Sequence, residues 1–301
     1  MQNPIEPALR EALGPLAPVA ARLPRAMRIL LEAFFRLSTD DGWAIASHIA
    51  LSTLMSLFPF LIVVTALAGF VGSKSLADEA ARLLLGAWPV EVAEPIANEI
   101  RRVATAAQGR PLTVGVVFSV YFASSAIESL RIGLNRAYEV IEKRRWWLLR
   151  LVSIVYVILS AIALLVLSVL VVLGPLITAT VAVHFPWMAQ FDLTVTIVRF
   201  GIATLILAVT LFMVHYWLPA GKRRPADIVP GIAVTLVLWL AAGAAFGAYL
   251  SAFANQYVLT YAGLASVMIA LVFLYFSAAI FLFGGEINAA FLRARQGIRG
   301  H

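Results

Sequence analysis

The chain has 301 residues, of which 62% are hydrophobic and only 13% charged, with a mean hydropathy of +0.92. A water-soluble domain of this length could not cover so much apolar surface, so the composition excludes an ordinary soluble protein and predicts an all-α, polytopic membrane protein. The absence of cysteine excludes disulfides and thiolate chemistry, and the formal charge of +7 indicates an anionic partner, either nucleic acid or a membrane surface.

Residues 1–42 are predicted to form a cytoplasmic segment without a cleaved signal peptide, because no short apolar core precedes a small-residue cleavage site. Within this segment, residues 24–37 separate charged from apolar side chains on two helical faces, a pattern typical of a helix lying in the membrane interface. The charged face carries Arg25, Arg28, Glu32 and Arg36, and the apolar face carries Met27, Leu30, Leu31, Phe34 and Phe35.

Six stretches are long and apolar enough to cross a bilayer as helices, which takes about 20 residues each. We place them at about 43–72, 111–134, 148–174, 193–218, 228–250 and 261–292. No Asp, Glu, Lys or Arg occurs between Asp227 and Glu286, a run long enough for two passes. Ser38 or Thr39 is predicted to cap the first span. A turn at residues 255–257 is predicted to separate the fifth span from the sixth.

The remaining segments are predicted to lie at the membrane surface. Residues 73–110 mix charged residues with apolar ones at helical spacing, which predicts a short helical cap outside the membrane. Residues 176–191 stay apolar but contain Pro186, which favours an interfacial or re-entrant piece over another pass. Residues 293–301 are expected to be a basic cytoplasmic tail.

The distribution of basic residues predicts the orientation. With a cytoplasmic N-terminus, seventeen Lys and Arg residues fall in inside segments and five in outside segments. This positive-inside excess predicts that both termini are cytoplasmic. Lys143-Arg144-Arg145 followed by Trp146-Trp147 could form a nucleic-acid patch, but at a span boundary it reads more naturally as a basic and aromatic interfacial belt. The basic turns therefore explain the net charge by anionic lipid rather than nucleic acid.

Polar side chains inside a bilayer are costly, so each marks a candidate site. Three predicted spans bring such residues to the same cytoplasmic level, and we expect a polar vestibule there. It would consist of His48, Ser52, Ser56, Glu128, Arg131, Asn135, Glu286 and Asn288, with Arg131 bridging the carboxylates of Glu128 and Glu286 and Pro59 kinking the first span. In the alternative, the serines bond back to their own helix, His48 packs against a neighbouring helix, and Glu128 with Arg131 is an ordinary boundary ion pair.

Other polar or small residues within the spans are weaker candidates. Arg199 can either snorkel to the headgroups or contact an anion. His184 and His215 have no carboxylate or second histidine at ligand spacing, so neither a metal nor another cofactor is predicted. Gly243 and Gly247 form a small-xxx-small pair suited to close helix packing, although an alanine-rich helix can produce the pair by chance.

Several sequence blocks, taken in order, resemble the BrkB/YihY family of bacterial inner-membrane proteins over residues 25–292. The blocks are Ser56-Leu57-Phe58-Pro59, Asn135-Arg136-Ala137-Tyr138, Pro219-Ala220-Gly221-Lys222-Arg223-Arg224 leading to Pro230-Gly231, Tyr261-Ala262-Gly263, and Gly285-Glu286-Ile287-Asn288-Ala289. The resemblance implies six membrane helices and a bacterial inner-membrane location. The chain departs from the family at residues 50–53, where many relatives carry tyrosines, so no role of those tyrosines is carried over.

Three functions are compared. The first is transport or handling of an amphipathic, anionic envelope component such as a lipid, with membrane lipids as the expected partners. The second is a non-enzymatic scaffold whose cap binds an envelope partner. The third is a nuclease, which a label within the resembling family suggests. RNA hydrolysis needs placed acid and base groups or metal ligands, whereas the inside loops offer mainly Lys and Arg, so we expect no enzyme activity and no nucleic-acid partner. A protein partner or a second copy stays open.

Overall fold

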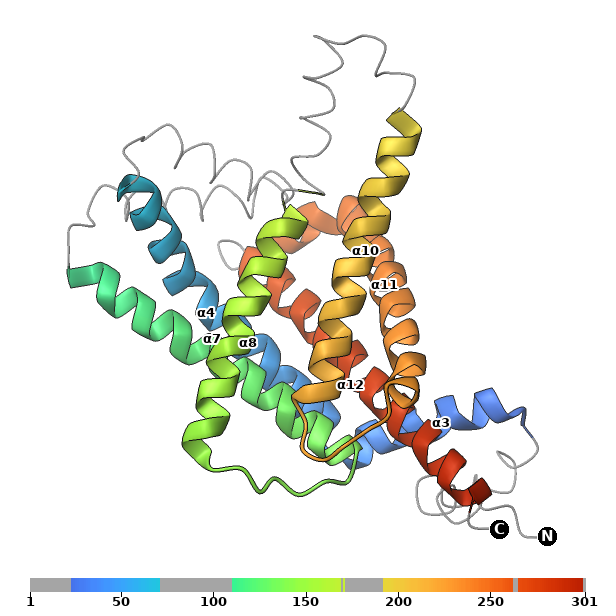
Figure 1. Cartoon of the computed structure of the whole chain (residues 1–301). Coiled ribbons are helices and arrows are strands. Elements are labelled where there is room, and N and C mark those ends of the chain that lie inside the picture. The colour runs from blue at the N-terminus through green and yellow to red at the C-terminus, as the bar shows by residue number, and fades with distance from the viewer. Residues whose placement is uncertain (1–22, 71–109, 169, 171–191, 262–264, 300–301) are drawn as a thin grey trace.

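The structure, a computed structural model, describes residues 23–70, 110–168, 170, 192–261 and 265–299. The part described contains seven helices, which confirms the predicted all-α class. In chain order they are α3 (Arg25–Thr39), α4 (Gly42–Phe70), α7 (Arg110–Ala137), α8 (Trp146–Ser168), α10 (Asp192–Trp217), α11 (Pro225–Tyr261) and α12 (Ala265–Arg299), as Figure 1 shows.

Four stretches within the described helices are long and apolar enough to cross a membrane. They are Trp146–Ala163 of α8, Leu193–Trp217 of α10, Pro225–Leu250 of α11 and Val267–Arg295 of α12, which lie on the third to sixth predicted spans. The first two predicted spans fall on α4 and α7, helices of 29 and 28 residues. The predicted cap, the re-entrant piece and the end of the third span lie outside the described residues.

Helix α12 runs through the middle of the bundle and packs against α3, α4, α7 and α11 (Figure 1). Its candidate span is 39% buried, against 17% for the spans of α8 and α10. The outer helices instead turn large apolar side chains outward, among them Ile158, Leu205 and Leu240. Such a surface suits hydrocarbon, since lipid tails are as apolar as these side chains. The buried core centres on Leu37, Ile49, Leu134, Leu218, Ile228 and Leu282.

Helices α11 and α12 cross in very close contact. A side-chain carbon at Gly231 would overlap the carbonyl oxygen of Gly284, and one at Gly284 would overlap the hydroxyl of Thr235. Asn288 completes the contact, because its Oδ1 accepts the N–H of Gly231 at 2.6 Å. Glycine is needed here because the two backbones approach closely, which small residues allow between membrane helices.

The prediction of close packing at Gly243 and Gly247 is wrong for contacts within the described part of the chain. No atom lies within 4 Å of the point where a side chain would begin at either position. Both glycines lie on the exposed face of α11, one to two turns of helix beyond the point where that helix leaves the core. Spacing shows that two small residues share a face, but not which neighbour that face meets.

Helix α3 has the two faces that its sequence predicts. Met27, Leu30 and Phe34 are exposed, whereas Glu32 is 1% exposed and lies against α12. The buried face of α3 consists of Ile29, Ala33 and Leu37 together with Glu32, so one charged side chain is turned into the protein. The exposed apolar side chains are the arrangement expected of a helix that meets the lipid interface. Figure 1 shows α3 crossing α12 near the carboxyl end of α12.

The capping prediction for the first span is wrong. Helix α3 continues through Thr39, so Ser38 and Thr39 lie in its last turn rather than before the next helix. Their hydroxyls donate back to the carbonyls of Phe34 at 3.5 Å and Arg36 at 3.1 Å. Asp41, with φ of 57°, makes the turn into α4 instead.

The turn predicted at residues 255–257 is also wrong. Helix α11 continues to Tyr261, and α12 begins at Ala265. Residues 251–261 contain neither glycine nor proline, so nothing local opposes the helix there, and Asn and Gln alone do not end one. Helix α12 also continues to Arg299, so the first residues of the predicted basic tail extend this helix.

Candidate functional site

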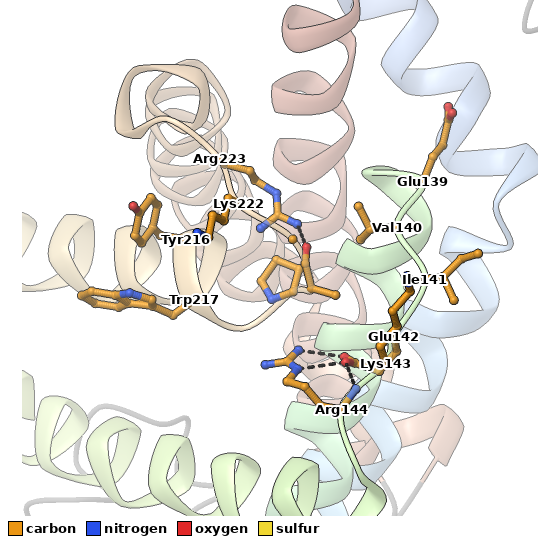
Figure 2. A pocket seen from close by; sticks show the side chains of 13 residues that line it. Glu139, Val140, Ile141, Glu142, Lys143, Arg144, Tyr216, Trp217, Lys222 and Arg223 are labelled. Carbon is orange, nitrogen blue, oxygen red and sulfur yellow. Dashed lines mark hydrogen bonds and ion pairs between the residues drawn. The ribbon is translucent and has the colours of Figure 1, made fainter.

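A cleft of about 1080 Å³ opens between the α7–α8 connection and the α10–α11 connection. Figure 2 shows that Tyr216 and Trp217 lie opposite the segment from Glu139 to Arg144, with Lys222 and Arg223 between them. We call it the basic cleft, and its lining residues are Glu139, Val140, Ile141, Glu142, Lys143, Arg144, Tyr216, Trp217, Pro219, Ala220, Gly221, Lys222 and Arg223.

The first wall of the basic cleft is the segment that follows α7. Its backbone turns at Glu139, whose φ of 53° is uncommon for a residue other than glycine. Beyond that turn, Arg144 donates two parallel hydrogen bonds to Glu142, from Nε to Oε1 at 2.9 Å and from Nη2 to Oε2 at 2.7 Å. This bidentate pair fixes the segment, because a planar guanidinium matches both carboxylate oxygens at once.

The second wall is the tight connection between α10 and α11. It turns at Gly221, whose φ of +86° disfavours any side chain. Two bonds tie this wall to the first. Arg144 donates to the carbonyl of Leu218 at 2.9 Å, and the N–H of Ala220 donates to Oδ1 of Asn135 at 2.7 Å. The amide of Asn135 also donates to Glu142 at 3.3 Å, so one side chain holds both walls.

The lining of the basic cleft has an excess of positive charge. Its two carboxylates are already neutralised, since Glu142 pairs with Arg144, and Glu139 pairs with Arg36 at 2.8 Å from outside the cleft. The hydrogen bonds from Arg144 lower the pKa of Glu142 to about 2, so this carboxylate stays charged and occupied. In the described part of the chain, no carboxylate pairs with Lys143, Lys222 or Arg223.

Among the residues that the structure describes, Arg223 is held in place by contacts other than ion pairs. Its guanidinium lies over the ring of Tyr138 at 4.1 Å and donates to the carbonyl of Ala220. Burial lowers the pKa of Arg223 and raises that of Tyr138 to about 12, so the phenol stays neutral beneath the cation. Such cation–π stacking fixes the arginine while leaving its charge available to an anion.

An apolar groove of about 300 Å³ lies between α8 and α10. Tyr156, Leu159, Leu205 and Met213 are among its lining residues, and Tyr156 donates to the carbonyl of Met213 at 3.1 Å. Since the basic cleft includes Tyr216 and Trp217 of the same helix α10, the groove and the cleft lie within about one helical turn of each other along that helix.

The predicted vestibule residues are mostly buried, but they do not act as one set. Asn135 lies at the basic cleft, whereas Asn288 holds the α11–α12 crossing. The predicted bridge by Arg131 is absent. Glu128 pairs with Arg150 near the start of α8, at 3.1 Å, and Glu286 is buried at 2% exposure. Arg150 comes from another helix, so spacing along α7 could not reveal it.

Residues of the first span follow the alternative interpretation in which they serve packing. His48 lies against α7, with its Nδ1 at 2.7 Å from the hydroxyl of Ser129. Ser56 donates back to the carbonyl of Thr53 at 2.7 Å, and Ser52 is buried. Pro59 lies inside α4, and its predicted kink stays a prediction.

Two further candidates, His215 and Arg199, make packing contacts with aromatic rings. His215 is fully buried, stacks on Phe281 with ring centroids 4.7 Å apart, and has no hydrogen-bond partner for either ring nitrogen among the described residues. Arg199 lies over the ring of its neighbour Phe200 at 4.9 Å. The part of the chain that the structure describes has no group of three or more His, Asp or Glu side chains able to hold a metal ion. His184 lies outside the described residues.

Sequence reasoning missed the basic cleft itself. Its cations were assigned to separate basic turns, and nothing in their spacing shows that the two turns meet. One signal was present, since Pro219–Arg224 and Asn135–Tyr138 are two of the blocks on which the family resemblance rests. Short loops that contain glycine and proline and are held on a rigid scaffold often carry functional residues. Glu139 had no such signal.

The helices and the lipid-facing surface define a multi-pass, all-α membrane protein. A sequence model of the family described as Virulence factor BrkB matches residues 33–300, and the chain belongs to this family. It is 27% identical over 264 residues to YfkH of Bacillus subtilis (strain 168), which is named as ribonuclease-like; the match covers 87% of this chain and 94% of that protein.

A second relative is a UPF0761 membrane protein of Rhodospirillum centenum, 27% identical over 289 residues. That match covers 94% of this chain, and the chain spans 62% of the length of that protein. No solved structure matches. Three of the blocks that carried the resemblance meet at one end of the bundle, where Asn135 binds Ala220 and Asn288 binds Gly231.

Proposed function

We propose that this protein handles an anionic, amphipathic envelope component, such as a lipid, whose headgroup enters the basic cleft. One observation supports this above all. Lys143, Lys222 and Arg223 face a common space while both carboxylates of that space are neutralised by arginines. Converging cations without counter-charges favour an anion, and arginine forks suit phosphate and carboxylate groups.

The surroundings of the basic cleft favour an amphipathic ligand over a free ion. Trp146 and Trp147 are exposed beside Lys143 and Arg144, and tryptophan prefers the level of the headgroups. The apolar groove between α8 and α10 lies about one helical turn from the cleft along α10, and its apolar lining suits an acyl chain. A ligand with a charged head and an apolar chain would match both.

We further propose six membrane passes in a bacterial inner membrane, with both termini and the basic cleft in the cytoplasm. The excess of Lys and Arg in alternate segments supports this orientation. Tags at the two chain ends should both be protected in sealed right-side-out vesicles and accessible in inverted ones. Tags accessible from opposite sides would show an odd number of passes.

A nuclease fits the basic cleft poorly. General acid–base catalysis needs a group whose pKa lies near the working pH. The pKa of Glu142 is held near 2 by Arg144, and Glu139 is committed to two arginines. We therefore propose a non-enzymatic role without a cofactor or a nucleic-acid partner. The scaffold alternative depends on the cap, which lies outside the described residues.

The chain offers a matched pair of variants for the test. Lys143→Ala with Lys222→Ala removes two cations that line the basic cleft, whereas Arg145→Ala with Arg224→Ala removes two exposed cations from the same connections that do not line it. Both double variants lower the net charge equally, so general attraction to anionic membranes changes alike.

The parent and both double variants would be extracted in native-lipid discs, and their lipids quantified against the bulk membrane. We expect anionic lipid to be enriched with the parent and with the arginine double variant, and the enrichment to be lost with the lysine double variant. Equal lipid profiles for all three proteins would refute headgroup binding in the cleft. High salt should weaken the enrichment, because partly exposed charges are screened.

A further inference from the structure

Arg131 is a buried arginine of α7 whose charge has no partner in the described part of the chain. It is 8% exposed, and its Nε and Nη1 are enclosed without a hydrogen-bond partner among the described residues. Within the same residues, the carboxylates of Glu128 and Glu142 make their ion pairs with other arginines. Arginine keeps its charge in proteins, so the fold encloses a cation that is not neutralised.

The bonds of its neighbours place Arg131 beside the basic cleft. Residues three and four apart share a helix face, so Arg131 lies between Glu128 and Asn135 on one face of α7. Glu128 reaches α8 through Arg150 at 3.1 Å, and Asn135 reaches the second wall of the cleft through Ala220 at 2.7 Å. Arg131 is thus about 6 Å along α7 from the side chain that ties the two walls together.

The carboxylate nearest to this tie has no acceptor capacity left for Arg131. Glu142 Oε1 accepts from the backbone N–H of Arg144 at 3.1 Å and from its Nε at 2.9 Å. Glu142 Oε2 accepts from Arg144 Nη2 at 2.7 Å and from the amide of Asn135 at 3.3 Å. Two hydrogen bonds on each oxygen fill the four lone-pair sites of a carboxylate.

A buried guanidinium that lacks a counter-charge is costly, and a neutral side chain of the same length would avoid the cost. Enclosed water would satisfy the N–H groups but would bring no negative charge. An oxyanion supplies both, and the planar guanidinium matches phosphate and carboxylate groups. The geometry therefore favours an anion as the missing partner.

We propose that Arg131 forms a buried anion site near the carboxyl end of α7, which binds one phosphate-type oxyanion, either free phosphate or the phosphate of a lipid headgroup. Its Nη2 is not among the enclosed atoms, and each fork of the guanidinium pairs Nη2 with one of the two nitrogens that lack a partner. The anion approaches at Nη2. The site is separate from Lys143 and Lys222, so it does not depend on headgroup binding by those lysines.

Thermal unfolding of the full chain in maltoside micelles tests the site, because maltosides contain no phosphate. The background is Lys143→Ala with Lys222→Ala, which removes two cations of the basic cleft. In one arm, inorganic phosphate replaces chloride at constant ionic strength. In the other, phosphatidylglycerol is compared with diacylglycerol, which has the same chains but no phosphate. A ligand that binds only the folded protein raises the midpoint of unfolding.

Three substitutions in that background separate the site from general charge effects. Arg131→Met keeps the length and removes the charge, so the rise in midpoint should be lost, while the midpoint without anion should be unchanged or higher. Arg136→Met removes the same charge from a side chain of α7 that is 47% exposed, and the rise should persist. Arg131→Lys keeps the charge but not the fork, so phosphate should bind about tenfold more weakly.

A rise with phosphate, with phosphatidylglycerol or with both, lost in Arg131→Met, would support the site, and the arm that responds identifies the source of the anion. The proposal is overturned if neither arm raises the midpoint, or if the rise survives in Arg131→Met. Should Arg131→Met not fold, unchanged phosphate affinity in Arg131→Lys would overturn it instead. Every protein compared lacks the cleft lysines, so failure here is distinct from failure of the proposed function.

Discussion

The crossing of α11 and α12 predicts that two glycine-to-alanine substitutions in the same helix have different effects on the free energy of unfolding. Gly231→Ala would place a methyl group against the carbonyl oxygen of Gly284, which is backbone and cannot rotate away. The two helices would have to separate, and the bond from the Gly231 N–H to Asn288 would lengthen from 2.6 Å. Gly243→Ala adds the same methyl group where nothing lies within 4 Å.

The magnitudes follow from three contributions. Overpacking a tight contact costs about 1–3 kcal/mol. Losing the Asn288 hydrogen bond costs about 1 kcal/mol. Replacing glycine by alanine inside a helix gains about 1 kcal/mol. Gly231→Ala should therefore destabilise the protein by about 1–3 kcal/mol, whereas Gly243→Ala should leave its stability unchanged or raise it by up to about 1 kcal/mol.

Unfolding in mixed micelles titrated with a denaturing detergent, followed by circular dichroism and tryptophan fluorescence, measures both changes on one scale. Thr235→Ser serves as a mild control at the same crossing, since it keeps the hydroxyl that meets Gly284. If Gly231→Ala and Gly243→Ala shift the unfolding free energy in the same direction by the same amount, the helices do not cross at Gly231. The placement of Asn288 would then be wrong as well.

Three further predictions concern the ties around the basic cleft. Gly221→Ala should lower the midpoint of thermal unfolding by a cost of roughly 1–2 kcal/mol, because a left-handed backbone disfavours a side chain. An unchanged midpoint would place that turn elsewhere. Ser129→Ala should cost about 1 kcal/mol by removing the bond to His48, and the loss should vanish in a His48→Phe background. The Arg144 bonds hold the pKa of Glu142 near 2, below its ordinary 4.5, so the pair stabilises the fold above pH 4.5. The difference in thermal midpoint between parent and Glu142→Gln should be constant above pH 4.5 and shrink toward pH 2; a constant difference down to pH 2 would contradict the pairing.

Segments with a strong local signal were predictable from the sequence. The apolar stretches from α8 to α12 and the two faces of α3 follow from periodicity, which depends on neighbours within a few residues. The turn at residues 255–257 was placed wrongly because polar side chains were taken as a stop signal, although no glycine or proline breaks the helix before its end at Tyr261. Helix ends depend on such weak preferences and on tertiary contacts.

The candidate site was less predictable, because its partners lie far apart in the chain. Asn135 was identified as a site residue, but its partners Ala220 and Glu142 were not. Glu128 was paired with Arg131, three residues away, whereas its actual partner Arg150 starts another helix. Helical spacing shows only which residues could meet on one helix, while ion pairs between helices depend on how the helices cross.

At this end of the bundle, the polar side chains differ in whether their donors and acceptors have partners within the protein. Asn135 and the Glu142–Arg144 pair have their partners within the protein, so their energetic contribution is to hold the walls. Arg131 differs, since it is 8% exposed and neither its Nε nor its Nη1 has a hydrogen-bond partner among the described residues. It lies one helical turn from Asn135 and feels the charges of both Glu142 and Arg144. A buried guanidinium whose N–H groups lack partners is costly to keep, so a contribution to stability does not explain Arg131.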